Sequence, residues 1–160
     1  MSKNWGNEVP GAGHMAARLD DTDRLIVELL QADGRMSMRK LAEDLHISRT
    51  NAYTRLQRLQ DEGVIVGFQA VVHPERLGFT IAAYIAVKLR QRSWHGFAEG
   101  LANVPGVEQA AMIAGEYDAM LLVRARDARV MRDVILEQLQ AMPEVLGTQT
   151  MFVLDERPSS

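Results

Sequence analysis

Three arginines lie among short polar side chains in the segment that runs from Ser48 to the next acidic residue, Asp61. Guanidinium groups pair with phosphate oxygens, and short hydroxyl and amide side chains exchange hydrogen bonds with base edges in the major groove of DNA. On a helix, such side chains lie opposite a stripe of apolar residues at Ala52, Leu56 and Leu59. The segment therefore predicts a helix that contacts DNA. Its outward side chains are Thr50, Asn51, Thr54 and Arg58, with Arg55 on the flank.

Two short helices joined by a tight corner must present that face. Ser37 and Ser48 are good N-cap residues for the first and second helix. Between them, Leu41, Ala42 and Leu45 recur at the spacing of an amphipathic helix. The pattern predicts a helix-turn-helix pair.

Basic charge is concentrated around this pair. Residues 35–60 contain six basic and two acidic residues, whereas the whole chain of 160 residues has a formal net charge of -3. The basic set is Arg35, Arg39, Lys40, Arg49, Arg55 and Arg58. A basic helix face can also be ordinary solvated surface, but two capped helices in tandem favour DNA binding.

The flanking segments predict the rest of a winged helix-turn-helix domain. Upstream, the acidic residues at 20, 21 and 23 lie where the dipole of a helix N-terminus favours negative charge, and Gly34 is expected to end that helix. Its expected buried face is Leu25, Ile26, Leu29 and Leu30. Downstream, residues 64–72 are rich in β-branched and aromatic side chains, which predicts a strand or wing.

Composition limits the remaining possibilities. The chain has no cysteine, so disulfides and thiolate metal sites are excluded, which is compatible with a reducing cytoplasm. The longest apolar run, residues 81–87, is far shorter than a membrane span, and we expect a soluble, cytoplasmic protein. Residues 1–17 are rich in glycine with few large apolar side chains, and we expect a disordered tail there.

The second half of the chain alternates between strand and helix patterns in the order β-α-β-β-α-β. Strands are expected at residues 81–89, 106–114, 119–125 and 145–154, with the middle two forming a hairpin. Helices are expected after Ser93, with Phe97, Ala98 and Leu101 facing inward, and after Asp127. The inward residues of the second helix are Val130, Met131, Val134, Ile135 and Leu139. This order is that of the ferredoxin-like fold, in which both helices cover one face of the sheet.

The other face of that sheet is too apolar to be solvated. Ala82, Tyr84 and Ala86 alternate with the core positions of the first strand. We expect two such sheets to pack together in a homodimer, which would also suit a DNA site with two symmetric halves. The alternative is that a loop or the DNA-binding domain covers these side chains.

The chain resembles the Lrp/AsnC family of leucine-responsive, or feast/famine, regulators over residues 19–155. The resemblance rests on the order and spacing of short motifs: Leu19-Asp20-Asp21-Thr22-Asp23-Arg24, Leu41-Ala42, Ile47-Ser48, Arg55-Leu56-Gln57-Arg58-Leu59, Gly63-Val64-Ile65 and Gly115-Glu116-Tyr117-Asp118. It implies an α+β protein with a winged helix-turn-helix at 18–66, a linker at 67–79, a ferredoxin-like (RAM-type) effector and oligomerisation domain at 80–155, and a tail at 156–160. It also implies a transcriptional regulator that binds palindromic DNA, forms dimers and octamers of four dimers, and binds an amino acid or related small effector.

Site residues follow from the resemblance position by position. Its DNA contacts fall on Arg39, Ser48, Arg49, Thr50, Asn51, Thr54, Arg55 and Arg58. Its effector site falls on Ala114, Gly115, Glu116, Tyr117 and Asp118, with Thr148 and Thr150 as weaker candidates. Gly115 would let a ligand carboxylate approach the backbone, and Asp118 could pair with an α-ammonium group. Relatives often have a hydroxyl residue at position 114. The turn can also be an ordinary hairpin with a structural aspartate.

Two other classes of protein share parts of this architecture. Some siroheme decarboxylases have the same two-domain build, but the histidines here, His14, His46, His73 and His95, are scattered without metal-ligand spacing. Amino-acid-binding ACT domains share the β-α-β-β-α-β order but not the basic helix. We therefore expect no enzyme activity, no metal and no cofactor other than the effector.

Overall fold

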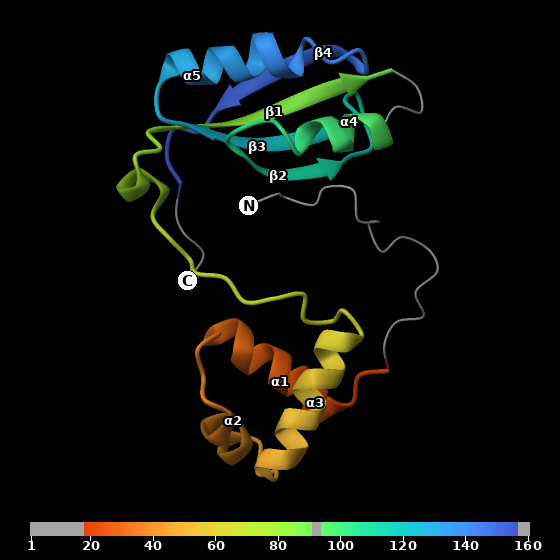
Figure 1. Ribbon diagram of the computed structural model, residues 1–160, viewed down its shortest axis with the longest axis vertical. Helices are drawn as coiled ribbons and strands as arrows, with labels where there is room; N and C mark the ends of the chain where they lie inside the picture. Colours follow the sequence, from red (N-terminus) through yellow and green to blue (C-terminus); the bar gives the residue numbers. More distant parts are fainter. Residues whose placement is uncertain (1–17, 91–93, 157–160) are drawn as a thin grey trace. The chain divides into compact units, whose positions relative to one another are not determined.

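The computed structural model describes residues 18–90 and 94–156 (Figure 1). Contacts divide the chain between Val71 and Val72 into two compact units. The tail predicted at 1–17 and the cap predicted at Ser93 lie outside the described residues. No helix in the described part is both long and apolar enough to cross a bilayer.

The N-terminal unit contains the three predicted helices, α1 (Asp21–Ala32), α2 (Met38–Asp44) and α3 (Arg49–Asp61). Each begins at a side-chain cap: Asp20 forms a reciprocal capping box with Asp23, and the hydroxyls of Ser37 and Ser48 accept hydrogen bonds from backbone N–H groups three residues on. The core is formed by Ile26, Leu30, Leu41 and Leu59. The predicted caps at Ser37 and Ser48 are thus confirmed.

A left-handed residue makes the corner between α2 and α3. His46 has φ of 52°, and the N–H of Ile47 returns to the carbonyl of Ala42 at 3.0 Å. This hydrogen bond uses one of the free carbonyls at the end of α2 and fixes the direction in which α3 starts.

The prediction of a strand at residues 64–72 is wrong, because this segment forms no strand in a single copy of the chain. Within the described residues this segment has no strand partner, and Val66 is 96% exposed. β-branched side chains favour extended backbone, but a strand forms only where a second strand supplies the ladder. Two smaller corrections concern α1: Asp33 rather than Gly34 is its C-cap, and Leu25 is exposed while Ile26 and Leu30 are buried.

The C-terminal unit is a four-stranded antiparallel sheet with the order β2-β3-β1-β4 (Figure 1). The strands are β1 (Ile81–Leu89), β2 (Val107–Met112), β3 (Ala119–Ala125) and β4 (Val145–Phe152), after a short η1 (Pro74–Leu77). Helix α4 (Trp94–Leu101) follows β1, and α5 (Ala128–Asp133), extended by the π-helical η2 (Val134–Leu139), follows β3. The β-α-β-β-α-β order is confirmed.

Both helices pack on the same face of this sheet. Phe97 and Leu101 of α4 and Met131 of α5 join one core with the inward residues of β1 and β3, such as Ile85 and Leu121. The predicted caps and inward residues are confirmed at Asp127, Phe97, Ala98, Leu101, Met131, Val134 and Leu139. Val130 was expected to face inward but is exposed, because it lies one residue off the buried stripe at Met131 and Val134. Strand β4 ends at Phe152, two residues earlier than predicted.

Candidate nucleic-acid and effector sites

An ion-pair network joins α3 to the start of α1. The Nη1 atom of Arg55 lies 2.7 Å from carboxylate oxygens of both Asp20 and Asp23, and Nη2 of Arg58 pairs with the other oxygen of Asp23. Asp23 has no exposed surface. Its two oxygens are therefore shared between two guanidinium groups and the backbone N–H of Asp20. We call these four residues the α1–α3 clamp.

The arginines determine the charge state of the buried carboxylate. Burial alone raises the pKa of Asp23, but hydrogen bonds from Arg58, Arg55 and the Asp20 backbone lower it to about 2. The same pairing lowers the pKa of Asp20, chiefly through its hydrogen bond with Arg55. The clamp is thus fully ionised at neutral pH.

The clamp changes the expected roles of Arg55 and Arg58. Both guanidinium groups turn back toward α1, although Arg58 was expected on the outward face. The side chain of Arg55 is 23% exposed and that of Arg58 41% exposed. Arg55 also donates from Nε to the Oδ1 of Asn51 at 2.9 Å, so Asn51 keeps its amide N–H groups and one lone pair of Oδ1 for other partners.

The outward face of α3 is formed by uncharged polar residues. Thr50, Tyr53, Thr54 and Gln57 are all exposed. A shallow depression at the C-terminal end of this face is lined by Tyr53, Thr54 and Gln57 together with the charged residues at its edge, Arg58, Asp61 and Glu62. Tyr53 and Gln57 were absent from the predicted site, although they follow Thr50 at the i+3 and i+7 positions that share a helix face.

The other predicted DNA contacts lie near the N-terminus of α3 and on α2. Ser48 is the N-cap, whose Oγ accepts from the N–H of Asn51 at 3.1 Å. Arg49 is exposed at the first position of the helix, and none of the ion pairs among the described residues involves it. Arg39 on α2 is exposed and lies 3.8 Å from Glu43.

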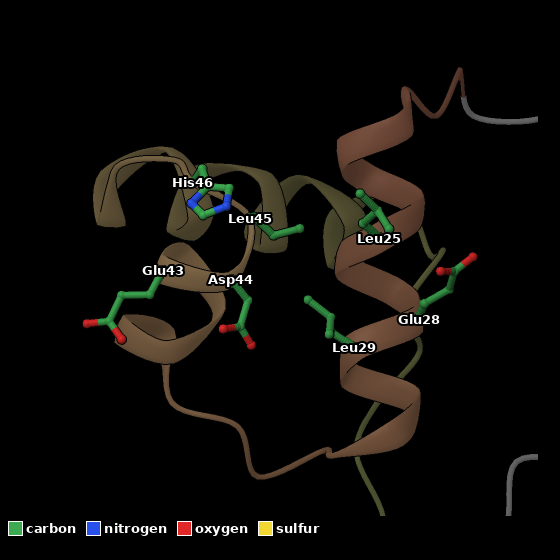
Figure 2. Close-up of a pocket in the computed structure, with 7 residues that line it drawn as sticks. All are labelled: Leu25, Glu28, Leu29, Glu43, Asp44, Leu45 and His46. Atoms are coloured by element: carbon green, nitrogen blue, oxygen red, sulfur yellow. The ribbon is translucent and has the colours of Figure 1, made fainter.

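A second concavity in the N-terminal unit is acidic. Figure 2 shows the groove between α1 and the end of α2, where leucines form the floor and carboxylates the rim. The lining residues are Leu25, Glu28, Leu29, Glu43, Asp44, Leu45 and His46. Negative charge repels a phosphate backbone, and no residue of α3 lines this groove, so the groove and the outward face of α3 are separate surfaces.

In the C-terminal unit, Asp118 of the predicted effector turn already has partners. Its Oδ2 accepts a hydrogen bond from the N–H of Leu89 at 2.9 Å and lies 3.2 Å from the Nζ of Lys88. These contacts lower its pKa, with the Leu89 N–H as the largest cause. Lys88 also donates to the carbonyl of Glu116 at 2.7 Å. Asp118 thus ties the hairpin turn to the end of β1, the structural role that the sequence left open.

The remaining residues of the predicted effector site fall into two groups. Ala114, Gly115 and Glu116 are exposed in the turn, and Gly115 has φ of 148° with open space where a Cβ would lie. Thr148 and Thr150 lie opposite Val87 and Ile85 in the sheet register, and therefore on the face that the helices cover. The hydroxyl of Thr148 accepts from Gln140 at 2.8 Å. Among the described residues, no hydrogen bond links either threonine to the turn, in which Tyr117 is half-buried.

The face of the sheet opposite the helices is apolar at its centre. Tyr84 of β1 is 43% exposed there, and its register partners on the neighbouring strands are Leu122 and Met151. Ala82 and Ala86 lie on the same face of β1, although neighbouring side chains bury Ala86. In the part of the chain that the structure describes, no helix covers this face.

Comparisons with known proteins agree with both halves of this architecture. Residues 19–66 match the family model described as winged helix-turn-helix DNA-binding, and residues 82–159 match the Lrp/AsnC ligand binding domain. The proline dehydrogenase transcriptional activator of Rhizobium radiobacter is 40% identical over 144 residues, which cover 88% of this chain and 92% of the relative.

Solved structures give the same result. A transcriptional regulator from Neisseria meningitidis, in complex with L-Met, has a TM-score of 0.80 and 28% identity, covering 89% of this chain and 94% of its own. The leucine response regulatory protein of Mycobacterium tuberculosis has a TM-score of 0.79 and 30% identity. The match covers 88% of this chain and 96% of the relative. Two domain matches in this order, together with a relative matched over nearly its whole length, show that the chain belongs to the Lrp/AsnC family of DNA-binding transcriptional regulators.

Proposed function

We propose that a homodimer of this chain binds a palindromic operator by placing the outward face of α3 in the major groove. The observation that supports this most directly is the composition of that face: hydroxyl and amide side chains are exposed, and no carboxylate occurs on α3 before Asp61. Such a surface can approach phosphates and still form hydrogen bonds with base edges.

Phosphate contacts are assigned to the cations that the clamp leaves free. Arg39 and Arg49 are exposed, and Ser48 lies at the N-terminus of α3, where backbone N–H groups favour an anion. Asn51 keeps its amide N–H groups, and Arg55 and Arg58 contribute only the N–H groups not bound to Asp20 and Asp23.

The proposal is tested by gel retardation with the DNA upstream of the chain's own gene, over a range of salt concentrations. A complex that weakens steeply as salt rises supports it. Arg49→Ala should lower affinity for every sequence and reduce the salt slope by about one, whereas Arg24→Ala, an exposed arginine on α1, should change neither. Absence of a salt-sensitive complex at any protein concentration would contradict DNA binding.

The free sheet face supports dimer formation. Tyr84, Leu122 and Met151 form an apolar surface that no described element covers, and a second sheet of the same kind would bury it. The exposed, unpaired segment around Val66 and Val71 provides a second surface that a partner copy could cover. We extend the assembly to an octamer of four dimers on the family's pattern.

Sedimentation of the full chain tests this assembly. Tyr84→Glu should shift the protein toward monomer, because a charge would be buried between the two sheets. Leu25→Glu, which changes a similarly exposed residue of the other unit, should leave the mass unchanged. A mass for the unmodified chain that remains monomeric at all concentrations would overturn the dimer.

We assign the effector, an amino acid, to the turn at 114–118. The L-Met complex of the Neisseria relative supports this class of ligand. In this chain the ligand's ammonium group would share Asp118 with Lys88, and its carboxylate would approach the open backbone at Gly115. The proposal places the regulator in the cytoplasm with its DNA and assigns it no catalytic step.

Titration calorimetry with single amino acids tests the effector site. Asp118→Asn should abolish the binding heat, because the amide cannot pair with an ammonium group as a carboxylate does. Asp127→Asn is the matched control, since asparagine also caps a helix well and position 127 lies outside the turn. Equal binding heats in the two variants would contradict the assignment of Asp118.

A further inference from the structure

The outward stripe of α3 has the geometry of a base-recognition surface without a free arginine. Thr50, Thr54 and Gln57 follow one another at i, i+4 and i+7, so they lie on one side of the helix, opposite the buried Ala52 and Leu59. At 1.5 Å rise per residue, Thr50 and Gln57 are about 10 Å apart along the axis. That length spans about three stacked base pairs at 3.4 Å each.

Gln57 is held in a defined orientation on this stripe. Its Nε2 donates a hydrogen bond to the Oδ1 of Asp61 at 2.9 Å, one helical turn on. A carboxylate only accepts, so this bond fixes which end of the amide is the donor. The amide keeps its carbonyl oxygen and its second N–H, which are the two groups used in a bidentate contact with adenine N6 and N7.

Thr54 complements that contact with an apolar group. Its hydroxyl donates to the carbonyl of Thr50 at 3.0 Å, within the helix. The hydroxyl proton is therefore not available to a base, and the exposed side chain offers mainly its methyl group. A threonine methyl makes a favourable contact with the 5-methyl group of thymine.

The clamp prevents Arg55 from recognising guanine in the usual bidentate way. Bidentate contact needs two N–H groups on one edge of the guanidinium. In Arg55, the Nε–H group donates to Asn51, and the N–H groups of Nη1 donate to the carboxylates of Asp20 and Asp23. Arg58 gives Nη2 to Asp23, so among the described residues Arg55 and Arg58 are the two cations that pair with this buried carboxylate.

We propose that α3 recognises A·T base pairs through Gln57 and Thr54, and that Arg55 and Arg58 are positioning residues that hold α3 against α1. Gln57 contacts adenine, and the Thr54 methyl contacts thymine. This inference rests on the proposed DNA binding and adds the chemistry of its sequence preference.

The test is the base preference of the full-length protein, measured by selection from a randomised duplex library. Gln57→Ala should lose about 5- to 150-fold of the preference for adenine at one position of each half-site, with an unchanged salt slope. Gln57→Glu should move that preference toward cytosine, whose N4 amino group donates to a carboxylate. Gln31→Ala is the matched control, because Gln31 is the same residue type and is exposed, but lies on α1 and not on α3.

A different result is expected if Arg58 positions α3. Arg58→Ala should weaken binding to all sequences and keep the same base preference, and Arg58→Lys should restore affinity because lysine can still pair with Asp23. An altered base preference in Arg58→Ala, or an unaltered one in Gln57→Ala, would overturn the inference while DNA binding itself stands. Failure of the unmodified chain to select any sequence would instead overturn the proposed DNA binding.

Discussion

The two candidate sites differ in what remains free once internal ion pairs are formed. In the N-terminal unit, Arg55 and Arg58 are bound by Asp23, yet a separate stripe of exposed polar side chains is left on α3. In the C-terminal unit, Asp118 is bound by Lys88 and the Leu89 N–H, and the exposed turn beside it offers backbone and few polar side chains.

A charged residue in a recognition motif can therefore pair either with a ligand or with another residue of the protein. Where the protein is the partner, the charged residue positions the element and neighbouring uncharged groups are left for recognition. On α3 those groups are present. In the proposed effector turn, a ligand would have to compete with Lys88 for Asp118.

The largest effect should come from leaving the carboxylate of Asp23 without its cations. The double variant Arg55→Ala/Arg58→Ala does this, and we expect it to lower the unfolding free energy of the N-terminal unit more than any other variant described here. Urea denaturation followed by the amide signals of α1 and α3 measures it. Arg24→Ala/Arg39→Ala, which removes two exposed surface pairs, should cost less than about 1 kcal/mol. Similar losses in both variants would show that the clamp is not structural.

A smaller effect is expected from Asp118. Asp118→Ala removes the acceptor of the Leu89 N–H as well as the pair with Lys88, and should lower the urea midpoint of the C-terminal unit. Asp118→Asn keeps an acceptor oxygen and should lower it less. If both variants unfold like the unmodified chain, Asp118 has no structural role and is free for a ligand.

The pH dependence of the Asp23 carboxyl tests the ion pairs of the clamp. The Asp23 carboxyl should titrate near pH 2, against about 3.9 in an unfolded chain. Because the native pKa is the lower one, this stabilisation is present above about pH 4 and is lost as the pH falls through about 2. Carbon-13 shifts of the side-chain carboxyl measure the midpoint. In Arg58→Ala the midpoint should rise, and a midpoint that stays near 2 would contradict the pairing.

The smallest effect concerns the Thr54 methyl group. Thr54→Ser removes one methyl, worth about 0.8 kcal/mol when buried, and should reduce the preference for thymine about fourfold. Thr54→Val keeps a methyl on the same carbon and should retain the preference. Library selection with both variants measures the thymine preference. A preference that Thr54→Ser retains and Thr54→Val loses would assign the contact to the hydroxyl group.

Local patterns were sufficient to predict most of the fold. The caps at Ser37, Ser48 and Asp127 and the order of strands and helices follow from spacing within a few residues. The strand at 64–72 could not be predicted correctly in the same way, because pairing depends on a partner strand and not on the segment alone.

The candidate DNA-binding site shows the same limit of local sequence patterns. The acids at 20 and 23 were predicted to start a helix, which is correct, but their pairing with arginines more than 30 residues away has no local signal. Tyr53 and Gln57 could have been found by helical spacing from Thr50. Both side chains are longer than the hydroxyl and amide side chains that the predicted site includes, Thr50, Asn51 and Thr54.

The state of the clamp in the DNA complex can be measured directly. Carbon-13 spectra of Asp23 and nitrogen-15 spectra of the arginine side chains can be recorded for the full chain, free and bound to a selected operator. We expect Asp23 to stay ionised and paired with Arg55 and Arg58 in both states, and the Gln57 amide signals to shift on binding. Release of the arginines from Asp23 to the DNA, with the Gln57 signals unchanged, would contradict it.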